Sequence, residues 1–177
     1  MKRIALILAT TFPVMAFAAS QNTITFKGQV SDQTCSVTVN GNAANPVILM
    51  PTVSAAALAS ANSTAGETPF TISVSGCTAP GTGSGNLAIK TAFLGSDVTS
   101  AGNLVNAGGA TNVQVQLLDG AGGTAVKLNG ITSVAGLNLK EGETSASHDF
   151  AVRYISEAGG ATAGTVSATA QYALDYL

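Results

Sequence analysis

The end of the chain alternates strictly between apolar residues and mostly polar ones. The apolar positions are Val166, Ala168, Ala170, Tyr172, Leu174 and Tyr176. Successive side chains of a β-strand point to opposite faces, so this period of two predicts a strand over 166–176 with one buried face. A strand this long also needs a neighbour for its backbone hydrogen bonds. The question is which segment supplies it.

The same alternation recurs along the chain, with turn-forming glycine, proline and asparagine between the segments. It predicts further strands over 23–30, 34–39, 70–75, 87–94, 112–118, 125–128 and 148–155. Short strands at such spacing are typical of a β-sandwich. The alanine-rich stretch 53–61 is the one helical candidate, because alanine favours helix, and we expect a short helix or an irregular loop there.

The first eighteen residues have the pattern of a secretory signal peptide. Lys2 and Arg3 precede an apolar run, and Ala16-Phe17-Ala18 forms a cleavage pattern of small residues. The run is too short and too interrupted for a membrane anchor. We therefore expect export, with a mature chain that starts at Ala19 or Ser20.

The two cysteines, Cys35 and Cys77, are an even count in a chain predicted to be exported, which argues for one disulfide. A metal or redox pair is disfavoured, because the sequence has no C-x-x-C motif and a single histidine, His148. We expect no cofactor and no metal.

The charge content argues against a nucleic-acid partner. Only 9% of residues are charged, and removal of Lys2 and Arg3 takes the net charge from −2 to −4, whereas phosphate binding needs clustered Lys and Arg. Enzyme motifs are also missing. His148 and Asp149 are adjacent, so on a strand they face opposite ways, and no G-x-S-x-G elbow occurs. We interpret His148 as a surface histidine, and Glu141 and Glu143 as part of a solvated turn.

Four stretches resemble the pilins of chaperone–usher fimbriae, the group that contains the type 1 and type 3 major subunits. They read ITFKGQVSDQTCSV, PFTISVSGC, ATNVQVQLLDGAGGTAVKLNG and FAVRYISEAGGATAGTVSATAQYALDY. The last is the most specific, because Gly164 is fourteenth from the end and Tyr176 is penultimate, as in this family. The two cysteines fall where the family bridges its first and second strands.

The resemblance implies an all-β, incomplete immunoglobulin-like sandwich of six strands with one disulfide. The missing seventh strand leaves a groove whose edge is the terminal strand. The chaperone- and subunit-binding positions carried over from the family are Gly164, Val166, Ala168, Ala170, Tyr172, Leu174 and Tyr176. The implied organisation is a signal peptide at 1–18, a donor-strand extension at 19–33 and a pilin domain at 34–177.

In this family a periplasmic chaperone lends a strand to the groove, and the N-terminal extension of the next subunit then replaces it. The positions that share one face of the extension are Asn22, Ile24, Phe26, Gly28 and Val30. Gly28 corresponds to the family's donor-strand glycine, while Asn22 departs from the apolar residue expected there. The alternative from the residues alone is that the first and last strands pair within one sandwich.

The expected function is therefore a structural fimbrial subunit that polymerises with identical or related pilins into an extracellular filament used in cell adhesion. Its further partners would be the periplasmic chaperone and an outer-membrane usher. Two alternatives stay open: a minor, adaptor or adhesive pilin that binds a host-surface receptor, and a secreted enzyme on a sandwich scaffold.

Overall fold

The computed structural model describes residue 33 and residues 35–176, and the predicted signal peptide and donor positions lie outside them. The described chain is all-β apart from one short 3-10 helix, η1 (Ala55–Leu58), which confirms the predicted short helix. No helix among the described residues is long and apolar enough to cross a membrane. The strands are β1 (Ser36–Val39), β2 (Ser63–Ser75), β3 (Leu87–Gly95), β4 (Leu104–Val105), β5 (Gln114–Leu118), β6 (Ala125–Val126), β7 (Thr132–Leu139), β8 (Ala146–Ser156) and β9 (Ala170–Asp175).

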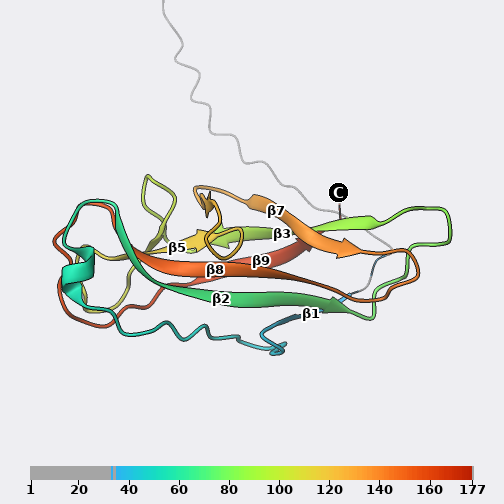
Figure 1. The fold of residues 1–177 in the computed structure, drawn as a ribbon, viewed down its shortest axis with the longest axis horizontal. Helices are drawn as coiled ribbons and strands as arrows, with labels where there is room; N and C mark the ends of the chain where they lie inside the picture. Colours follow the sequence, from blue (N-terminus) through green and yellow to red (C-terminus); the bar gives the residue numbers. More distant parts are fainter. Residues whose placement is uncertain (1–32, 34, 177) are drawn as a thin grey trace, which may run out of the picture. The chain divides into compact units, whose positions relative to one another are not determined.

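The strands form two antiparallel sheets (Figure 1). The larger sheet has the order β1-β2-β8-β5-β4, with β6 paired to β5, and the smaller has the order β7-β3-β9. Their apolar faces share one core. Phe150 on β8 stacks on Phe70 of β2 at 5.7 Å between ring centroids and meets Phe93 of β3 edge-on at 5.1 Å. The predicted all-β, immunoglobulin-like sandwich is confirmed, but the described residues form seven strands of four or more residues, β1, β2, β3, β5, β7, β8 and β9, where six were expected.

The strands differ from the sequence prediction in several places. The predicted strand over 125–128 is only the two-residue β6, β4 was not predicted, and β7 was not predicted because Gly136 interrupts its alternation. The β2 strand begins at Ser63 rather than at residue 70, and its pairing with β8 shifts register between Ala65 and Thr68. The β9 strand is shorter than predicted, and Ala170 is exposed rather than buried.

The Cys35–Cys77 disulfide forms, as predicted. It extends the β1–β2 ladder, in which Ser36 lies opposite Ser75. Beside it, the Gln33 amide donates to the Thr78 carbonyl and accepts from the Thr78 N–H, both at 3.1 Å. The disulfide thus ties the start of the domain to the end of β2.

His148 is not a simple surface histidine, which corrects the prediction. It is half-buried on β8, with its ring edge-on to Phe150 at 4.6 Å, and its Nε2 lies 2.9 Å from the carbonyl oxygen of Asp119. A Cβ on Gly136 of β7 would lie 2.3 Å from this ring, so the glycine lets β7 close over it. Asp149 faces the other way, as expected, and accepts from the Thr71 hydroxyl at 2.6 Å.

Candidate functional site

The β9 strand is the edge of the smaller sheet. It pairs with β3 through residues 170–175 and with no other described strand. The core-facing side chains of β9 and of the segment before it pack against the main core, yet they stay only partly buried: Val166, Ala168, Tyr172, Leu174 and Tyr176. An edge of this kind presents backbone groups that can pair with an added strand.

A second open edge belongs to the larger sheet. After β1, the chain turns at Asn40-Gly41 and runs extended through residues 46–53. Within the described part of the chain, residues 46–53 make no backbone hydrogen bonds. The core-facing Val37 of β1 and Ile48 and Met50 of this stretch are again only partly buried.

These two edges border the same part of the core. Met50 and Val166 each pack against both the main core and a smaller cluster formed by Leu58, Ala110, Val113 and Tyr154. We call the two edges together the open seam: residues 35–39 and 46–53 on one side, and 166–176 on the other. The seam combines two edges that no further described strand covers with partly exposed apolar side chains.

The opposite side of the sandwich is closed. There β7 covers β8 through the contact of Gly136 with His148, and Leu137 and Leu139 are at most 2% exposed. The seam, by contrast, holds several core-facing side chains that are only partly buried.

The chain before β9 is held by close backbone contacts. A Cβ on Gly164 would lie 2.4 Å from the backbone nitrogen of Ala110, so only glycine fits there. The Ala110 N–H then donates to the Thr165 carbonyl at 3.0 Å, and the Ala107 N–H donates to the Ser167 carbonyl at 2.8 Å. Gly164 thus lets the backbone of residues 164–167 lie against residues 107–110, which positions the seam-facing residues that come next in the chain.

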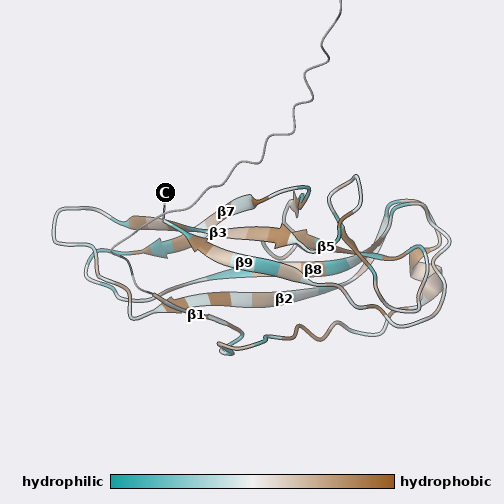
Figure 2. Cartoon of the chain, turned by 180° about the vertical axis from the view of Figure 1, so that it is seen from behind, coloured by the Kyte–Doolittle hydropathy of each residue, from teal (hydrophilic) through white to brown (hydrophobic). Residues whose placement is uncertain are grey.

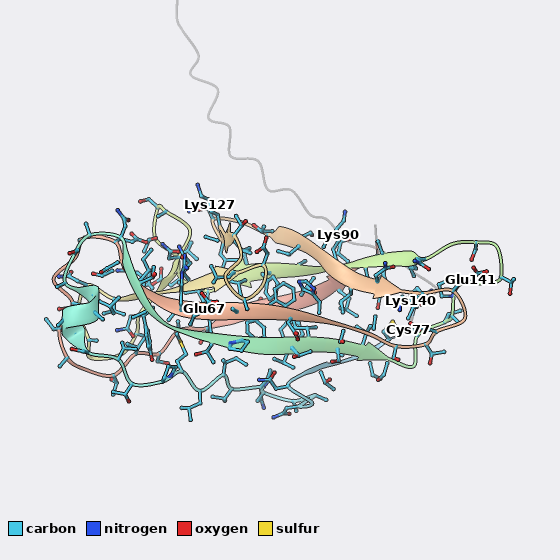
Figure 3. The ribbon with its side chains drawn as sticks, viewed as in Figure 1. Glu67, Cys77, Lys90, Lys127, Lys140 and Glu141 are labelled. Carbon is cyan, nitrogen blue, oxygen red and sulfur yellow. A yellow bond between two sulfur atoms is a disulfide. The ribbon has the colours of Figure 1, made fainter. Side chains whose placement is uncertain are left out.

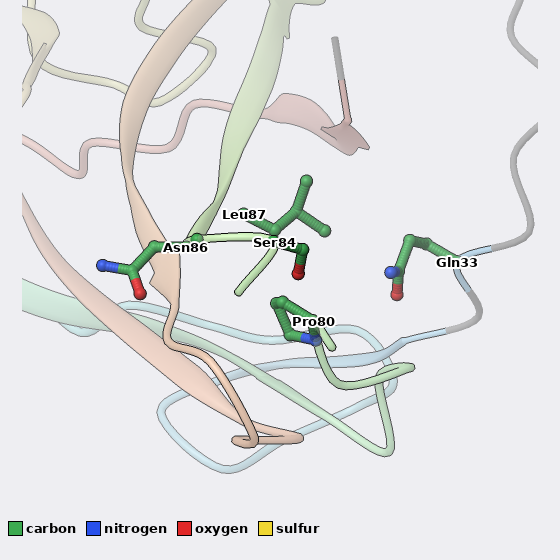
Figure 4. A pocket seen from close by; sticks show the side chains of 6 residues that line it. Gln33, Pro80, Ser84, Asn86 and Leu87 are labelled. Carbon is green, nitrogen blue, oxygen red and sulfur yellow. The ribbon is translucent and has the colours of Figure 1, made fainter. Parts of the chain in front are cut away.

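Two small pockets lie on the described surface. A pocket of about 250 Å³ lies beside the loop before β3 (Figure 4), and another of about 190 Å³ lies where residues 105–107 meet 167–169. The residues lining the first are Gln33, Pro80, Ser84, Gly85, Asn86 and Leu87, none of which titrates. Among the described residues, no three His, Cys, Asp or Glu side chains gather as metal ligands. Lys90, Lys127 and Lys140 lie on separate parts of the surface (Figure 3).

The structure therefore brings together most of the residues predicted for the terminal strand. Val166, Ala168, Tyr172, Leu174 and Tyr176 line the seam, Gly164 positions them, and Ala170 points away. The donor positions Asn22, Ile24, Phe26, Gly28 and Val30 lie outside the described residues. Ile48 and Met50 were missed, although the uncharged stretch PVILMP between two prolines could have indicated an edge segment.

Comparison with known proteins agrees with this geometry. The profile of the family described as "Fimbrial protein" matches residues 24–177. The F17 fimbrial protein of Escherichia coli is 40% identical, over 92% of this chain and 94% of the relative. The type-1 fimbrial protein A chain of Escherichia coli K12 is 31% identical, over 97% and 93%.

The fold is also similar to a solved structure of a chaperone–usher pilus, described as revealing the molecular basis of rod uncoiling. The TM-score is 0.60 at 24% identity, over 96% of this chain and 100% of that chain. This likeness supports the sandwich fold, and the family profile and the two relatives assign the family. The chain belongs to the fimbrial protein family.

Proposed function

We propose that this protein is a structural subunit of a chaperone–usher fimbria that polymerises by donor-strand exchange. The donor positions 22–30 within the extension of one copy would enter the open seam of the next and pair with β9 and the 46–53 segment. The observation that carries the proposal is the seam itself, where core-facing apolar side chains of two strand edges are only partly buried and no further described strand covers them.

The inserted strand would supply both backbone hydrogen-bonding groups and apolar side chains to the seam. Its backbone would pair with the edge of β9 that faces away from β3, and Ile24, Phe26 and Val30 would cover the partly exposed Tyr172 and Leu174. Burial of each large apolar side chain stabilises by roughly 1.5–3 kcal/mol. Gly28 adds no side chain and would fit where the seam is shallow.

The proposal implies an ordered set of partners. A periplasmic chaperone would cover the seam before assembly, because an uncovered apolar edge invites aggregation. An outer-membrane usher would then pass each subunit into an extracellular filament. A head-to-tail contact of this kind does not close on itself, so it generates a fibre.

A charge placed on the donor face tests the proposal. We expect Phe26→Arg to prevent filament formation, because the guanidinium would have to be buried in an apolar seam. Thr25→Arg is the matched control, since residue 25 faces the other side of the same strand. Material sheared from the cells would be run on SDS gels unboiled and boiled.

Wild type and Thr25→Arg should give a ladder of multimers that collapses to a single band on boiling. Phe26→Arg should give no ladder while still being detected in the periplasm. A normal Phe26→Arg ladder would refute the donor assignment. A lone monomer in the unboiled wild-type lane would refute strand exchange altogether.

A further inference from the structure

Met50 is the one methionine of the predicted mature chain, because Met1 and Met15 lie in the predicted signal peptide. The two cysteines are joined in the Cys35–Cys77 disulfide. The Met50 thioether is therefore the one sulfur of the mature chain that a mild oxidant such as a peroxide converts readily. Its place in the fold decides what that conversion does.

Met50 ends a short apolar run, residues 47–50, that lies between two prolines in the 46–53 segment of the seam. Figure 2 shows this run in the loop between β1 and η1, coloured toward the hydrophobic end of the scale. Its side chains alternate in direction. Val47 and Leu49 are 82% and 88% exposed, whereas Ile48 and Met50 pack against the core and are partly buried.

Met50 connects the seam to both hydrophobic clusters of the domain. Among the partly buried residues described, only Met50 and Val166, one from each edge of the seam, pack against both clusters. The unbranched and flexible methionine side chain suits such a position, because it can adapt to two packing surfaces. While the seam is open, the partial exposure of Met50 gives a small oxidant access to this side chain. A donor strand paired with the 46–53 segment would cover it.

We propose that Met50 is an oxidation site through which a peroxide prevents a subunit from accepting a donor strand. The sulfur attacks one peroxide oxygen, so that an S–O bond forms and the O–O bond breaks. The sulfur loses two electrons, and the other oxygen takes up the proton and leaves as water. The product is methionine sulfoxide, which is polar and disrupts apolar packing.

The sulfoxide has different consequences before and after strand insertion. In the open seam it can face water, so an oxidised subunit should still fold. Insertion of a donor would bury it among apolar side chains, which is unfavourable for a polar group without a partner. Because this inference rests on the proposed strand exchange, it also predicts that assembled subunits resist oxidation.

Protection by assembly is measured on the full-length protein with hydrogen peroxide as the probe. The samples are sheared wild-type filaments, the same filaments dissociated by boiling and kept in denaturant, and the purified folded subunit. Mass spectrometry of the peptide that contains Met50 gives the fraction that has gained one oxygen over time. We expect fast oxidation of the dissociated and folded subunits and slow oxidation of the filaments. Equal rates in filaments and dissociated subunits, or slow oxidation of the folded subunit, would overturn the proposal.

Met50→Gln tests the block on assembly, because glutamine is polar, uncharged and similar in length to the sulfoxide. We expect its ladder of SDS-resistant multimers to be about tenfold weaker than that of wild type, since an unpaired polar group would be buried. Met50→Leu, which is apolar and has no thioether, should give a normal ladder. The matched control is Leu49→Gln, which adds the same amide one residue away on a side chain that is 88% exposed.

The outcomes separate this inference from strand exchange itself. A normal Met50→Gln ladder would overturn the oxidation site and leave strand exchange intact. An equal loss in Leu49→Gln would also overturn it, because the effect would then not depend on the seam-facing position. Absence of a ladder in wild type would instead refute strand exchange.

A binding measurement guards against misfolding of Met50→Gln. Purified wild-type and Met50→Leu subunits are treated with hydrogen peroxide, checked for native circular dichroism, and titrated with a synthetic peptide of residues 19–33. We expect oxidation to weaken peptide binding about tenfold in wild type and to leave it unchanged in Met50→Leu. Unchanged binding by oxidised wild type would overturn the proposal. Absence of binding by untreated wild type would count against strand exchange.

Discussion

Substitution of Gly164 by alanine should destabilise the domain through backbone crowding alone. The added Cβ would lie 2.4 Å from the Ala110 nitrogen and 2.6 Å from the Gly109 carbonyl carbon. Neither atom belongs to a flexible side chain, so the two segments must separate. Overpacking of this kind costs about 1–3 kcal/mol, and weakening of the bond from Ala110 N–H to Thr165 adds about 1 kcal/mol. We therefore expect a loss of about 2–4 kcal/mol.

Urea unfolding of the purified, disulfide-intact subunit, followed by far-UV circular dichroism, measures this loss. A decrease of 2–4 kcal/mol corresponds to a midpoint lower by about 1–2 M urea for a domain of this size. Gly130→Ala is the matched control, because a Cβ there meets no atom within 4 Å. If Gly164→Ala and Gly130→Ala unfold at the same urea concentration, the close backbone approach is not the reason for glycine at position 164. A role of Gly164 in partner recognition would then have to be the reason.

Three further substitutions test the packing of the domain by the same measurement. Thr91→Val should stabilise by about 1 kcal/mol, because the Thr91 hydroxyl is the one buried side-chain polar atom without a partner among the described residues; Thr91→Ser, which keeps the hydroxyl, should not. Replacement of both Cys35 and Cys77 by serine should cost up to about 4 kcal/mol, given a separation of 42 residues, and an unchanged midpoint would contradict this. Gly136→Ala should destabilise because its Cβ would lie 2.3 Å from the His148 ring, and His148→Ala should remove most of that penalty in the double variant; additive effects would refute the contact.

The sequence predicted the sandwich well because its main strands are simple cases. In β3 and in the second half of β2 every second side chain enters one shared core, so burial follows the period of two. The β7 strand escaped prediction because Gly136 has no side chain and owes its place to His148, a contact between strands that no local pattern encodes. The histidine was misjudged for the same reason, since its burial depends on a strand that was not expected.

The candidate site was predicted from one side only. Tyr172 and Leu174 belong to a clear alternation, and the family resemblance gave that strand its role. The opposite edge was missed because Ile48 and Met50 lie among Val47 and Leu49, so no polar residue marks the outward face. That missing alternation is itself informative, because a segment that is apolar on both faces has two surfaces to bury.

The location of the seam explains how one chain can be both a folded domain and an unfinished one. The disulfide joins β1 to β2, and the cluster of Phe70, Phe93 and Phe150 joins the two sheets to each other. The fold can therefore persist while the seam is open. Insertion of a strand adds on the order of 5–9 kcal/mol from three large apolar side chains alone, and release requires every backbone pair to separate together. Assembly by this route should thus be slow to reverse, which makes the filament's durability a kinetic property.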